Sequence, residues 1–297
     1  MRVLLTGADG FVGRHLTPAL KARGHAVLAL TGPSASDAHA VDLLNMDALK
    51  REVGDFRPEV VLHLAAQSSV KEAWDYPQLT IAVNVIGTLN LWQAVVQPEL
   101  QQFIYISSSE VYGETSHERL TEDHPLTPMN PYAVSKAAAE QLLQMTVQQH
   151  PATRLTILRP FNHVGPGQAE SFAVPSFARQ VLQSERYIFV GNLTAVRDFL
   201  DVRDVVDAYC LAVESSTLSG TFNVSSGVGR SLKEVLDDLI RLAGRQHLVI
   251  VPDPARYRPL EALSIIGNSE RFQRATGWTP RWLWDDTLRD ILATLKT

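Results

Sequence analysis

The chain has 297 residues, of which 45% are hydrophobic and 20% are charged. This length and composition suit one large or two modest globular domains, and they exclude a disordered or fibrous protein. The formal net charge of −5 comes from 27 basic and 32 acidic residues that form no basic block. Nucleic acid and anionic membrane surfaces are therefore not expected as partners.

Cysteine, histidine and hydropathy patterns narrow the class further. The single cysteine, Cys210, excludes an internal disulfide, and no C-x-x-C or H-x-x-x-H spacing indicates a structural metal site. Every apolar run is shorter than the roughly 18 residues of a membrane-spanning helix. We therefore expect a cytoplasmic protein with no membrane partner and no bound metal.

Apolar runs of strand length alternate with segments of helical period through residue 160. Strands are predicted at 2–6, 26–30, 59–64, 102–107 and 154–159, and helices at 11–23, 46–53, 79–97 and 131–149. Parallel strands need long crossovers, and these helices are long enough to supply them. The alternation predicts an α/β fold of Rossmann type, which is a doubly wound parallel sheet with helices on both faces.

The pattern changes after Pro160, where a loop rich in Gly and Pro precedes shorter strands and helices. We place a domain boundary there, with the doubly wound domain at 1–160 and a smaller mixed α/β domain mainly at 161–297. A helix at 202–214 and a strand at 220–224 are expected to return to the first sheet.

A glycine loop follows the first predicted strand, with the sequence G-A-D-G-F-V-G at residues 7–13. Gly7 permits a tight turn, Gly10 lets the backbone approach a pyrophosphate, and Gly13 allows close helix packing. The position of the loop between a strand and a helix predicts a dinucleotide site rather than a structural turn. No G-x-x-x-x-G-K-[ST] motif occurs, which disfavours a nucleoside triphosphatase.

The choice between NADP and NAD depends on the end of the second strand, where NAD sites carry an acidic residue for the ribose 2′-hydroxyl. Thr31 stands there instead. Without a carboxylate there, a 2′-phosphate can be accommodated, and Arg14 can neutralise its charge. The alternative is that Arg14 is only a solvated residue on a helix face. We predict NADP, with NAD possible. Asp42, after a short third strand, is predicted either to bond the adenine amino group or to cap a turn or helix.

Two features indicate the reacting group. Tyr132 and Lys136, in Y-A-V-S-K, lie one helical turn apart, and a nearby ammonium is expected to lower the pKa of the phenol. A solvated helix face is the alternative for this common spacing. Ser108 follows a predicted strand at the carboxyl edge of the sheet, and Pro131 suits the first helical position before Tyr132. These two positions would place the side chains of Ser108, Tyr132 and Lys136 at one crevice.

In their order, G-x-x-G-x-x-G, H-L-A-A, S-S-S-E-V-Y-G and Y-x-x-x-K resemble the extended short-chain dehydrogenase/reductases that act on nucleotide sugars. The resemblance covers essentially the whole chain. It implies that Ser108 bonds the sugar oxygen, that Tyr132 transfers its proton, and that Lys136 tunes Tyr132 and holds the nicotinamide ribose. It also implies that Asn84 supports the site, whereas His63 is predicted to be a packed core residue.

The predicted cofactor residues combine the glycine loop with the ends of the strands and the Y-x-x-x-K pair. They are Gly7, Gly10, Phe11, Val12, Gly13, Arg14, Thr31, Asp42, Leu43, Leu64, Ala65, Ala66, Tyr132 and Lys136. The predicted substrate residues are Ser109, Glu110, Asn162, Arg197, Arg258 and Glu261. The resemblance places Asn162 beside the substrate pyrophosphate. Arginine forks suit phosphates and a carboxylate suits ribose hydroxyls, with a surface ion pair as the alternative for Arg197.

The second half, with F-N-H-V-G-P-G-Q and A-V-R-D-F-L-D-V-R-D, resembles the branch that reduces GDP-6-deoxy-4-keto-D-mannose to GDP-D-rhamnose. This resemblance implies a GDP-linked deoxy-keto sugar as substrate. The helices at 79–97 and 131–149 are similar to those through which members of the family form homodimers, which implies a homodimer here.

Three other functions are weighed. Related GDP-mannose 4,6-dehydratases carry Thr-x-Glu where this chain has Ser108 and Glu110, so the retained Glu110 keeps dehydration open. The glycine loop departs from the G-x-x-G-Q-D-G of those dehydratases. A nucleotide-sugar 4-epimerase is a second alternative. A catalytically silent NAD(P)-binding sensor or scaffold is the third, although it would have no need of an intact Ser108, Tyr132 and Lys136.

Overall fold

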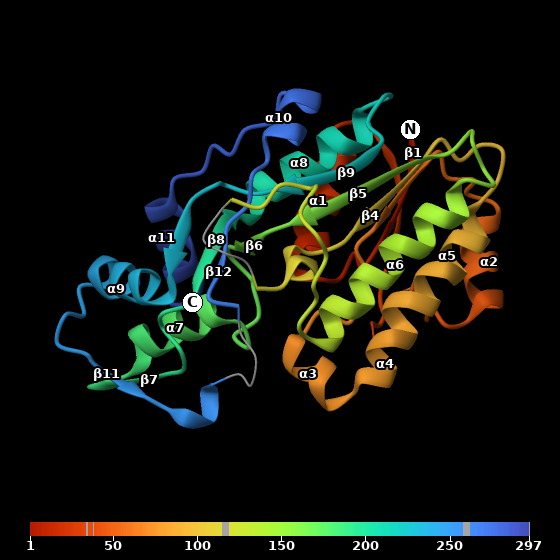
Figure 1. Cartoon of the computed structure of the whole chain (residues 1–297). Helices are drawn as coiled ribbons and strands as arrows, with labels where there is room; N and C mark the ends of the chain where they lie inside the picture. The colour runs from red at the N-terminus through yellow and green to blue at the C-terminus, as the bar shows by residue number, and fades with distance from the viewer. Residues whose placement is uncertain (34, 38, 115–118, 258–261, 297) are drawn as a thin grey trace.

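The computed structural model describes residues 1–33, 35–37, 39–114, 119–257 and 262–296. A six-stranded parallel sheet in the order β2-β1-β3-β4-β5-β9 forms the centre of the larger part of the molecule (Figure 1). Its strands are β1 (Arg2–Thr6), β2 (Ala26–Leu30), β3 (Val60–His63), β4 (Gln102–Ile106), β5 (Arg154–Pro160) and β9 (Gly220–Val224). The α/β fold class predicted from the sequence is therefore confirmed.

Helices cover both faces of this sheet. One face carries α1 (Phe11–Ala22) and α8 (Val202–Glu214), and the other carries α2 (Met46–Gly54), α5 (Gly87–Val95) and α6 (Pro131–Val147). Two short helices, α3 (Val70–Asp75) and α4 (Pro77–Ile81), precede α5 (Figure 1). No helix among the described residues is long and apolar enough to cross a membrane.

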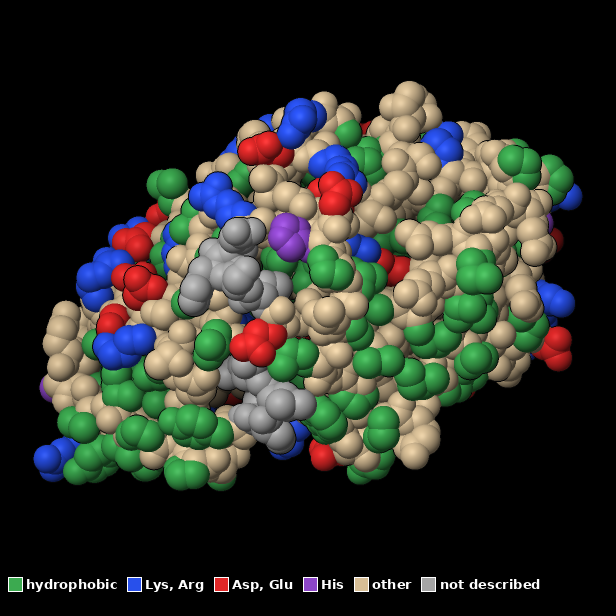
Figure 2. Space-filling view, viewed as in Figure 1, with side chains coloured by type: hydrophobic (Ala, Val, Ile, Leu, Met, Phe, Trp, Pro, Cys, Tyr) green, Lys and Arg blue, Asp and Glu red, His purple; other side chains and the backbone are tan. Residues whose placement is uncertain are grey.

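The outer surface around α3 to α6 is unusually apolar. Hydrophobic side chains gather over this side of the molecule in Figure 2. Large ones that are more than one third exposed are Trp74, Tyr76, Leu79, Ile81, Ile86, Val134 and Met145. We call these seven residues the α3–α6 patch. A contiguous apolar patch on a folded chain indicates an interaction surface.

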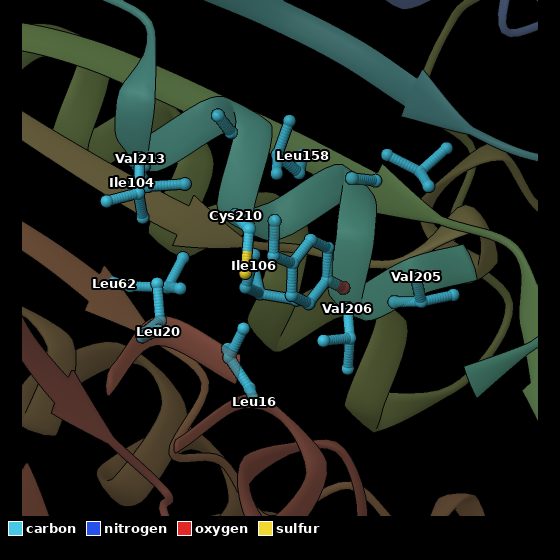
Figure 3. Packing of buried hydrophobic residues seen from close by; sticks show 14 of the residues in the cluster. Leu16, Leu20, Leu62, Ile104, Ile106, Leu158, Val205, Val206, Cys210 and Val213 are labelled. Atoms are coloured by element: carbon cyan, nitrogen blue, oxygen red, sulfur yellow. The ribbon is translucent and has the colours of Figure 1, made fainter. Parts of the chain in front are cut away.

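The buried core follows from the two-residue period of the strands. Leu62, Ile104 and Leu158 point to one face of the sheet, where they pack against Leu16 of α1 and Cys210 of α8 (Figure 3). Their strand neighbours point to the opposite face. There Val61, Phe103 and Ile157 pack with Leu91 and Leu143 from α5 and α6. The sheet is thus buried on both sides, as its nearly continuous apolar strands require.

The strand order reverses between β1 and β3, because β2 lies on one side of β1 and all later strands lie on the other. Helices connected to the two strands leave in opposite directions at such a point, which opens a crevice at the carboxyl ends of the strands. The glycine loop after β1 and the segment Leu64–Gln67 after β3 both lie at this reversal. The topology therefore brings the predicted cofactor residues together.

The helix predicted at 79–97 contains a π-helical turn that the sequence did not reveal. The chain forms α4, then a π-helical turn at Ala82–Ile86, and only then α5. Asn84 lies inside this turn and is 1% exposed. A π turn inserts one residue into a helix and frequently marks a functional site. The short strand predicted before Asp42 was also wrong, since only an isolated bridge joins Thr31 to Ala40.

The second half adds small sheets and helices beside the large sheet. Its elements are β6 (Asn162–Val164), α7 (Ala173–Gln183), β7 (Tyr187–Val190), β8 (Val196–Asp201), β10 (Gly229–Ser231), α9 (Leu232–Ala243), β11 (Val249–Pro252), β12 (Ser264–Ile265), α10 (Glu270–Thr276) and α11 (Trp284–Thr294). Strand β8 is paired with β6, β10 and β12, and β7 is paired with β11. Phe272 and Trp278 of this half pack into the core of the large sheet. The boundary near residue 160 stays a proposal.

A buried ion pair fixes α6 against β5. The Nε and Nη2 atoms of Arg159 donate to the two carboxylate oxygens of Glu140 at 2.9 and 2.5 Å. The side chains are 5% and 1% exposed. Arg159 Nη1 also donates to the hydroxyl of Tyr112 at 3.0 Å. Since Glu140 lies one turn after Lys136, this pair anchors the helix that carries both residues of the Y-x-x-x-K motif.

We predict that Glu140→Gln lowers the free energy of unfolding by about 3–5 kcal/mol, because it leaves the buried Arg159 charge without its counterion. Asp237→Asn is the matched control, since the Lys233–Asp237 pair is about half exposed and such pairs contribute at most about 1 kcal/mol. Denaturant unfolding of both variants checks this. Equal losses of stability in the two variants would contradict the role given to Glu140.

Candidate active site

A cavity of about 930 Å³ lies at the carboxyl edge of the large sheet, a volume in the range of cofactor and ligand sites. It is lined by the glycine loop, the ends of β1 to β5, the start of α6 and the loop after β6. The predicted site residues that line it are Gly7, Gly10, Phe11, Val12, Gly13, Arg14, Thr31, Asp42, Leu43, Leu64, Ala65, Ala66, Ser108, Ser109, Glu110, Tyr132, Lys136 and Asn162. The structure thus brings eighteen predicted residues to one cavity.

The glycine loop packs so closely against neighbouring backbone that it has no room for side chains at Gly7 and Gly13. Gly7 has a φ of +72°, and a Cβ there would lie 2.8 Å from the backbone nitrogen of Ala65. A Cβ on Gly13 would lie 2.1 Å from the carbonyl oxygen of Gly7. Gly10 is the N-cap of α1, so the amide donors and positive dipole of that helix face the cavity. These residues fit the pyrophosphate of a dinucleotide.

The adenine end of the predicted cofactor site lies beyond β2. Thr31 is 8% exposed, and its hydroxyl is buried without a hydrogen-bond partner. Asp42 Oδ1 accepts from the backbone nitrogen of Leu44 at 2.9 Å, so Asp42 caps a turn while it lines the cavity. Arg14 Nη2 donates to the carbonyl of Gly167 at 3.2 Å. A contact between Arg14 and a 2′-phosphate stays a prediction.

Ser108 and Glu110 lie where β4 ends and a single 3₁₀ turn, Ser109–Tyr112, begins. Ser108 is the N-cap of this turn, and its hydroxyl accepts from the backbone nitrogen of Glu110 at 3.2 Å. The carboxylate of Glu110 accepts from Asn130 Nδ2 at 3.0 Å. Asn130 in turn caps α6 through the backbone nitrogen of Ala133 at 2.8 Å. The end of β4 is therefore tied to the start of α6.

Tyr132 enters the cavity from the first turn of α6. Pro131 occupies the start of this helix, as the sequence predicted, and Tyr132 is 9% exposed. Burial raises the pKa of the phenol to about 12, opposed by a hydrogen bond with Ser108 and reinforced by the charge of Glu110. The expectation that Lys136 lowers the pKa of Tyr132 is wrong for this structure, because burial outweighs every stabilising contact that the phenolate receives.

Lys136 is 3% exposed and lies beneath Tyr132 in the same helix. Its ammonium donates to the carbonyl of Ile106 at 2.7 Å, and it lies 4.9 Å from the ring centroid of Tyr105 and 6.0 Å from that of Tyr132. Burial lowers the pKa of Lys136 to about 7, although the charge of Glu140 acts in the opposite direction. Near neutral pH, Lys136 therefore carries only part of a full positive charge.

Asn84 connects the π turn to the catalytic helix. Its Nδ2 donates to the hydroxyl of Ser135 at 2.9 Å and to the carbonyl of Gln67 at 3.0 Å. The hydroxyl of Ser135 donates to the backbone carbonyl of Tyr132 at 2.7 Å. The supporting role implied for Asn84 by resemblance is thus compatible with a defined path of hydrogen bonds, two bonds away from Tyr132.

The substrate side of the cavity contains only some of the predicted residues. Asn162 lines it, and its Oδ1 is buried without a partner, which leaves an acceptor ready for a bound group. Arg197 does not line this cavity. It is 6% exposed on β8, where Nη1 donates to the carbonyl of Val196 at 2.9 Å. Arg258 and Glu261 lie outside the described residues.

Several cavity residues were missed by sequence reasoning. Lys71, Gln168 and Tyr209 line the cavity from α3, from the loop after β6 and from α8. Gln168 ends the motif F-N-H-V-G-P-G-Q, which could have indicated it, whereas Lys71 and Tyr209 belong to no motif identified in the sequence. Asn130 also contributes by holding Glu110. Asn130 as N-cap followed by Pro131 as the first helical residue is a typical helix start and could have indicated this cap.

Comparison with known proteins agrees with this geometry. The NAD dependent epimerase/dehydratase family matches residues 3–225. The chain is 40% identical to the GDP-6-deoxy-D-mannose reductase of Pseudomonas aeruginosa, and the alignment covers 98% of this chain and 96% of that protein.

Two solved structures extend the likeness to the fold. The structure of RMD from Pseudomonas aeruginosa complexed with NADPH is 36% identical, with a TM-score of 0.89, and the match covers 100% of this chain and 99% of that one. The Thermus thermophilus UDP-glucose 4-epimerase complexed with NAD is 32% identical, with a TM-score of 0.90 and the same coverage.

The family match spans the glycine loop, Ser108, Tyr132, Lys136 and the returning strand β9. The cavity that the glycine loop, Ser108, Tyr132 and Lys136 line has the close-packed backbone of a dinucleotide site and a buried phenol beside it. The chain therefore belongs to the NAD dependent epimerase/dehydratase family of extended short-chain dehydrogenase/reductases, and it is an NAD(P)-dependent enzyme of the nucleotide-sugar reductase and epimerase type.

Proposed function

We propose that the chain reduces the 4-keto group of GDP-4-keto-6-deoxy-D-mannose to give GDP-D-rhamnose, with NADPH as the preferred cofactor and NADH as a possible one. The observation that carries this proposal is the 40% identity, over nearly the full chain, to a protein named GDP-6-deoxy-D-mannose reductase. The position of Ser108, Tyr132 and Lys136 around one cavity supports it, because these side chains suit carbonyl reduction.

The protonation state of Tyr132 suits a proton donor. With a pKa raised to about 12 by burial, the phenol keeps its proton at neutral pH and can donate it to a carbonyl oxygen that gains negative charge. NADPH held by the glycine loop would supply a hydride for the carbonyl carbon. Ser108, whose hydroxyl lines the same cavity, can donate a hydrogen bond to that oxygen.

Lys136 supports Tyr132 from below. Its hydrogen bond to Ile106 fixes the ammonium at the end of β4, where we propose that it bonds the nicotinamide ribose. Any positive charge on Lys136 favours the phenolate that remains after proton donation. The partial loss of that charge through burial limits the effect. In this proposal Lys136 acts on the phenolate that forms after proton donation, while the resting phenol keeps its proton.

NADPH is preferred in this proposal for two reasons. The end of β2 carries Thr31 where NAD sites carry a carboxylate, and the nearest carboxylate, Asp9, is already engaged as acceptor for the backbone nitrogen of Gly32 at 3.2 Å. The related Pseudomonas aeruginosa structure was determined with NADPH. NAD stays possible, since the related Thermus thermophilus epimerase was determined with NAD.

The competing dehydratase function depends on a free carboxylate at Glu110. In this structure the carboxylate accepts a hydrogen bond from Asn130, the residue that caps α6. This bond engages only Oε2 and ties Glu110 to the start of α6, while Glu110 still lines the cavity. The dehydratase alternative is therefore decided by the reaction itself.

We predict that purified protein consumes NADPH when mixed with GDP-4-keto-6-deoxy-D-mannose, and that the product is GDP-D-rhamnose by NMR. The absorbance of NADPH measures the reaction, and the coupling pattern at C4 assigns the configuration. GDP-mannose with NADP is the control for dehydration. Formation of a keto sugar from GDP-mannose without net cofactor use, or formation of the other C4 epimer, would contradict the proposal.

Removing the phenol hydroxyl tests the proton donor. We predict that Tyr132→Phe lowers kcat by about two to four orders of magnitude, the range of positioned acid–base groups, while the dissociation constant of NADPH stays nearly unchanged. Tyr187→Phe is the matched control, because Tyr187 is 45% exposed on β7 and does not line the cavity. Steady-state kinetics and fluorescence titration provide both values. An unchanged kcat in Tyr132→Phe would remove Tyr132 from the mechanism.

We also propose that the α3–α6 patch forms a homodimer interface. Two of its members, Ile86 and Met145, are 48% and 66% exposed on neighbouring helices, a costly exposure for a chain that stays monomeric. The helices involved are those that resemble the dimer helices of the family.

Light scattering tests the dimer. We predict a mass near twice 32.8 kDa for the native chain and near one chain for the double variant Ile81→Lys with Met145→Lys, because two buried charges oppose association. The control is Val249→Lys, which introduces a charge at a residue that is 43% exposed on β11. A monomeric native chain, or a control that dissociates equally, would contradict the proposed interface.

A further inference from the structure

A chain of buried polar side chains runs under the cavity from the end of β1 to the catalytic helix. We call it the His63 relay. His63 and Ser135 are 0% exposed, and Thr6, Asn84 and Thr88 are each 1% exposed. Its members are Thr6, His63, Thr88, Asn84 and Ser135. Side chains of this kind are retained in a core only when their hydrogen bonds are satisfied.

The first half of the relay holds the wall of the cavity. The backbone nitrogen of Ala65 donates to Thr6 Oγ1 at 3.2 Å, and Thr6 Oγ1 lies 2.7 Å from Nδ1 of His63. Ala65 is the residue whose backbone a Cβ on Gly7 would meet at 2.8 Å. His63 is therefore linked, through Thr6, to the backbone of Ala65 that packs against Gly7.

The second half of the relay holds the π turn. Thr88 Oγ1 donates to the carbonyl oxygen of Asn84 at 2.7 Å, and Nε2 of His63 lies 2.9 Å from Thr88 Oγ1. A hydroxyl has only one proton, and Thr88 gives it to Asn84. The bond between Thr88 and His63 must then be donated by Nε2–H of the imidazole.

These bonds define one tautomer. With Nε2 as a donor to Thr88, the neutral ring has Nδ1 as an acceptor, and Thr6 donates its only hydroxyl proton to it. Burial lowers the pKa of His63 to about 3, and the charge of Lys136 adds to this effect. The imidazole is thus neutral, and every bond from Ala65 to Asn84 runs in the same direction. A side chain with only one polar atom cannot bridge the two threonines.

The far end of the relay reaches the reacting residue. Asn84 Oδ1 accepts from the backbone nitrogen of Gln67 at 2.8 Å, and its Nδ2 donates to Ser135 at 2.9 Å. Ser135 donates to the backbone carbonyl of Tyr132. The same asparagine therefore fixes the segment after β3 and the first turn of α6.

We propose that His63 is a positioning residue whose neutral Nε2–H tautomer sets the cofactor wall at Ala65 and the helix turn of Tyr132 relative to one another. Its effect on turnover rests on the proposed function, in which Tyr132 donates the proton. The tautomer of His63 and its hydrogen bonds do not depend on the proposed function. Misplacement of a reacting group by about 1 Å can cost two orders of magnitude in rate, so a relay of fixed bonds has a kinetic consequence.

The variant Thr88→Val keeps the side-chain shape and removes the acceptor of the His63 Nε2–H bond. We expect kcat for the keto sugar to fall about tenfold, within the range of misplaced reacting groups, while the KM for the sugar changes less than about twofold. Thr88→Ser restores the hydroxyl and should restore kcat. Thr80→Val is the matched control, because Thr80 is 0% exposed and its hydroxyl donates to the carbonyl four residues earlier, on Tyr76, but has no bond to His63.

A second measurement needs no substrate. In ¹⁵N-histidine NMR spectra of the wild-type protein at pH 7, the signal that is lost in His63→Gln should report a neutral ring protonated at Nε2. A neutral ring protonated at Nδ1, or an imidazolium, would overturn the relay.

The kinetic outcomes separate positioning from folding. Equal kcat values for Thr88→Val and Thr80→Val, with a lower melting temperature in both, would reduce Thr88 and His63 to a structural role and overturn the proposal. A wild-type protein that does not turn over the keto sugar contradicts the proposed function instead, and the relay is then decided by the NMR spectrum.

Discussion

The structure depends on a single constraint, which is that polar groups withdrawn from water at the carboxyl edge of the sheet must be bonded inside the protein. Lys136 meets the carbonyl of Ile106, and Arg159 meets Glu140. Each pairing joins helix α6 to a strand, so the helix is held at two positions one turn apart. Unpaired charges at this depth would cost several kcal/mol each. Burial therefore supplies both the rigidity of the site and its shifted pKa values.

The same burial changes the chemistry expected of the Y-x-x-x-K pair. The spacing indicates a lysine that makes a tyrosine acidic, yet the phenol of Tyr132 is a weaker acid in the folded chain than in water. Lys136 loses part of its own charge in the same environment. A phenol that keeps its proton suits carbonyl reduction, in which the enzyme must give a proton to oxygen. Burial, together with the residue types, thus decides whether the phenol holds its proton ready for donation.

Local patterns predicted most of the fold. The five strands through residue 160, the Rossmann-type class and the start of α6 at Pro131 were confirmed, because apolar periodicity and caps are local signals. The π turn was missed, and the partners that Asn84 meets from within it, Gln67 and Ser135, lie 17 and 51 residues away in the chain. Glycines and strand ends likewise predicted the cavity wall, because topology carries every strand end to one edge.

The substrate residues of the second half stay predictions. The guanidinium fork of Arg197 suits a phosphate, and this residue lies on a strand whose partners, β10 and β12, come from much later in the chain. Where such a side chain lies is set by long-range pairing. The bridging role of His63 was missed for the same reason, because its partners Thr6 and Thr88 belong to other elements.

The sheet order has a consequence for how the polypeptide matures. Strand β5 is synthesised well before β9, its neighbour at the edge of the sheet, and the elements from β6 to α8 come between them. During translation the backbone groups along this side of β5 have no ladder partner until residues 220–224 leave the ribosome. An open edge of this kind invites pairing with foreign chains. This edge of β5 is therefore open to misassembly until the second half of the chain has been made.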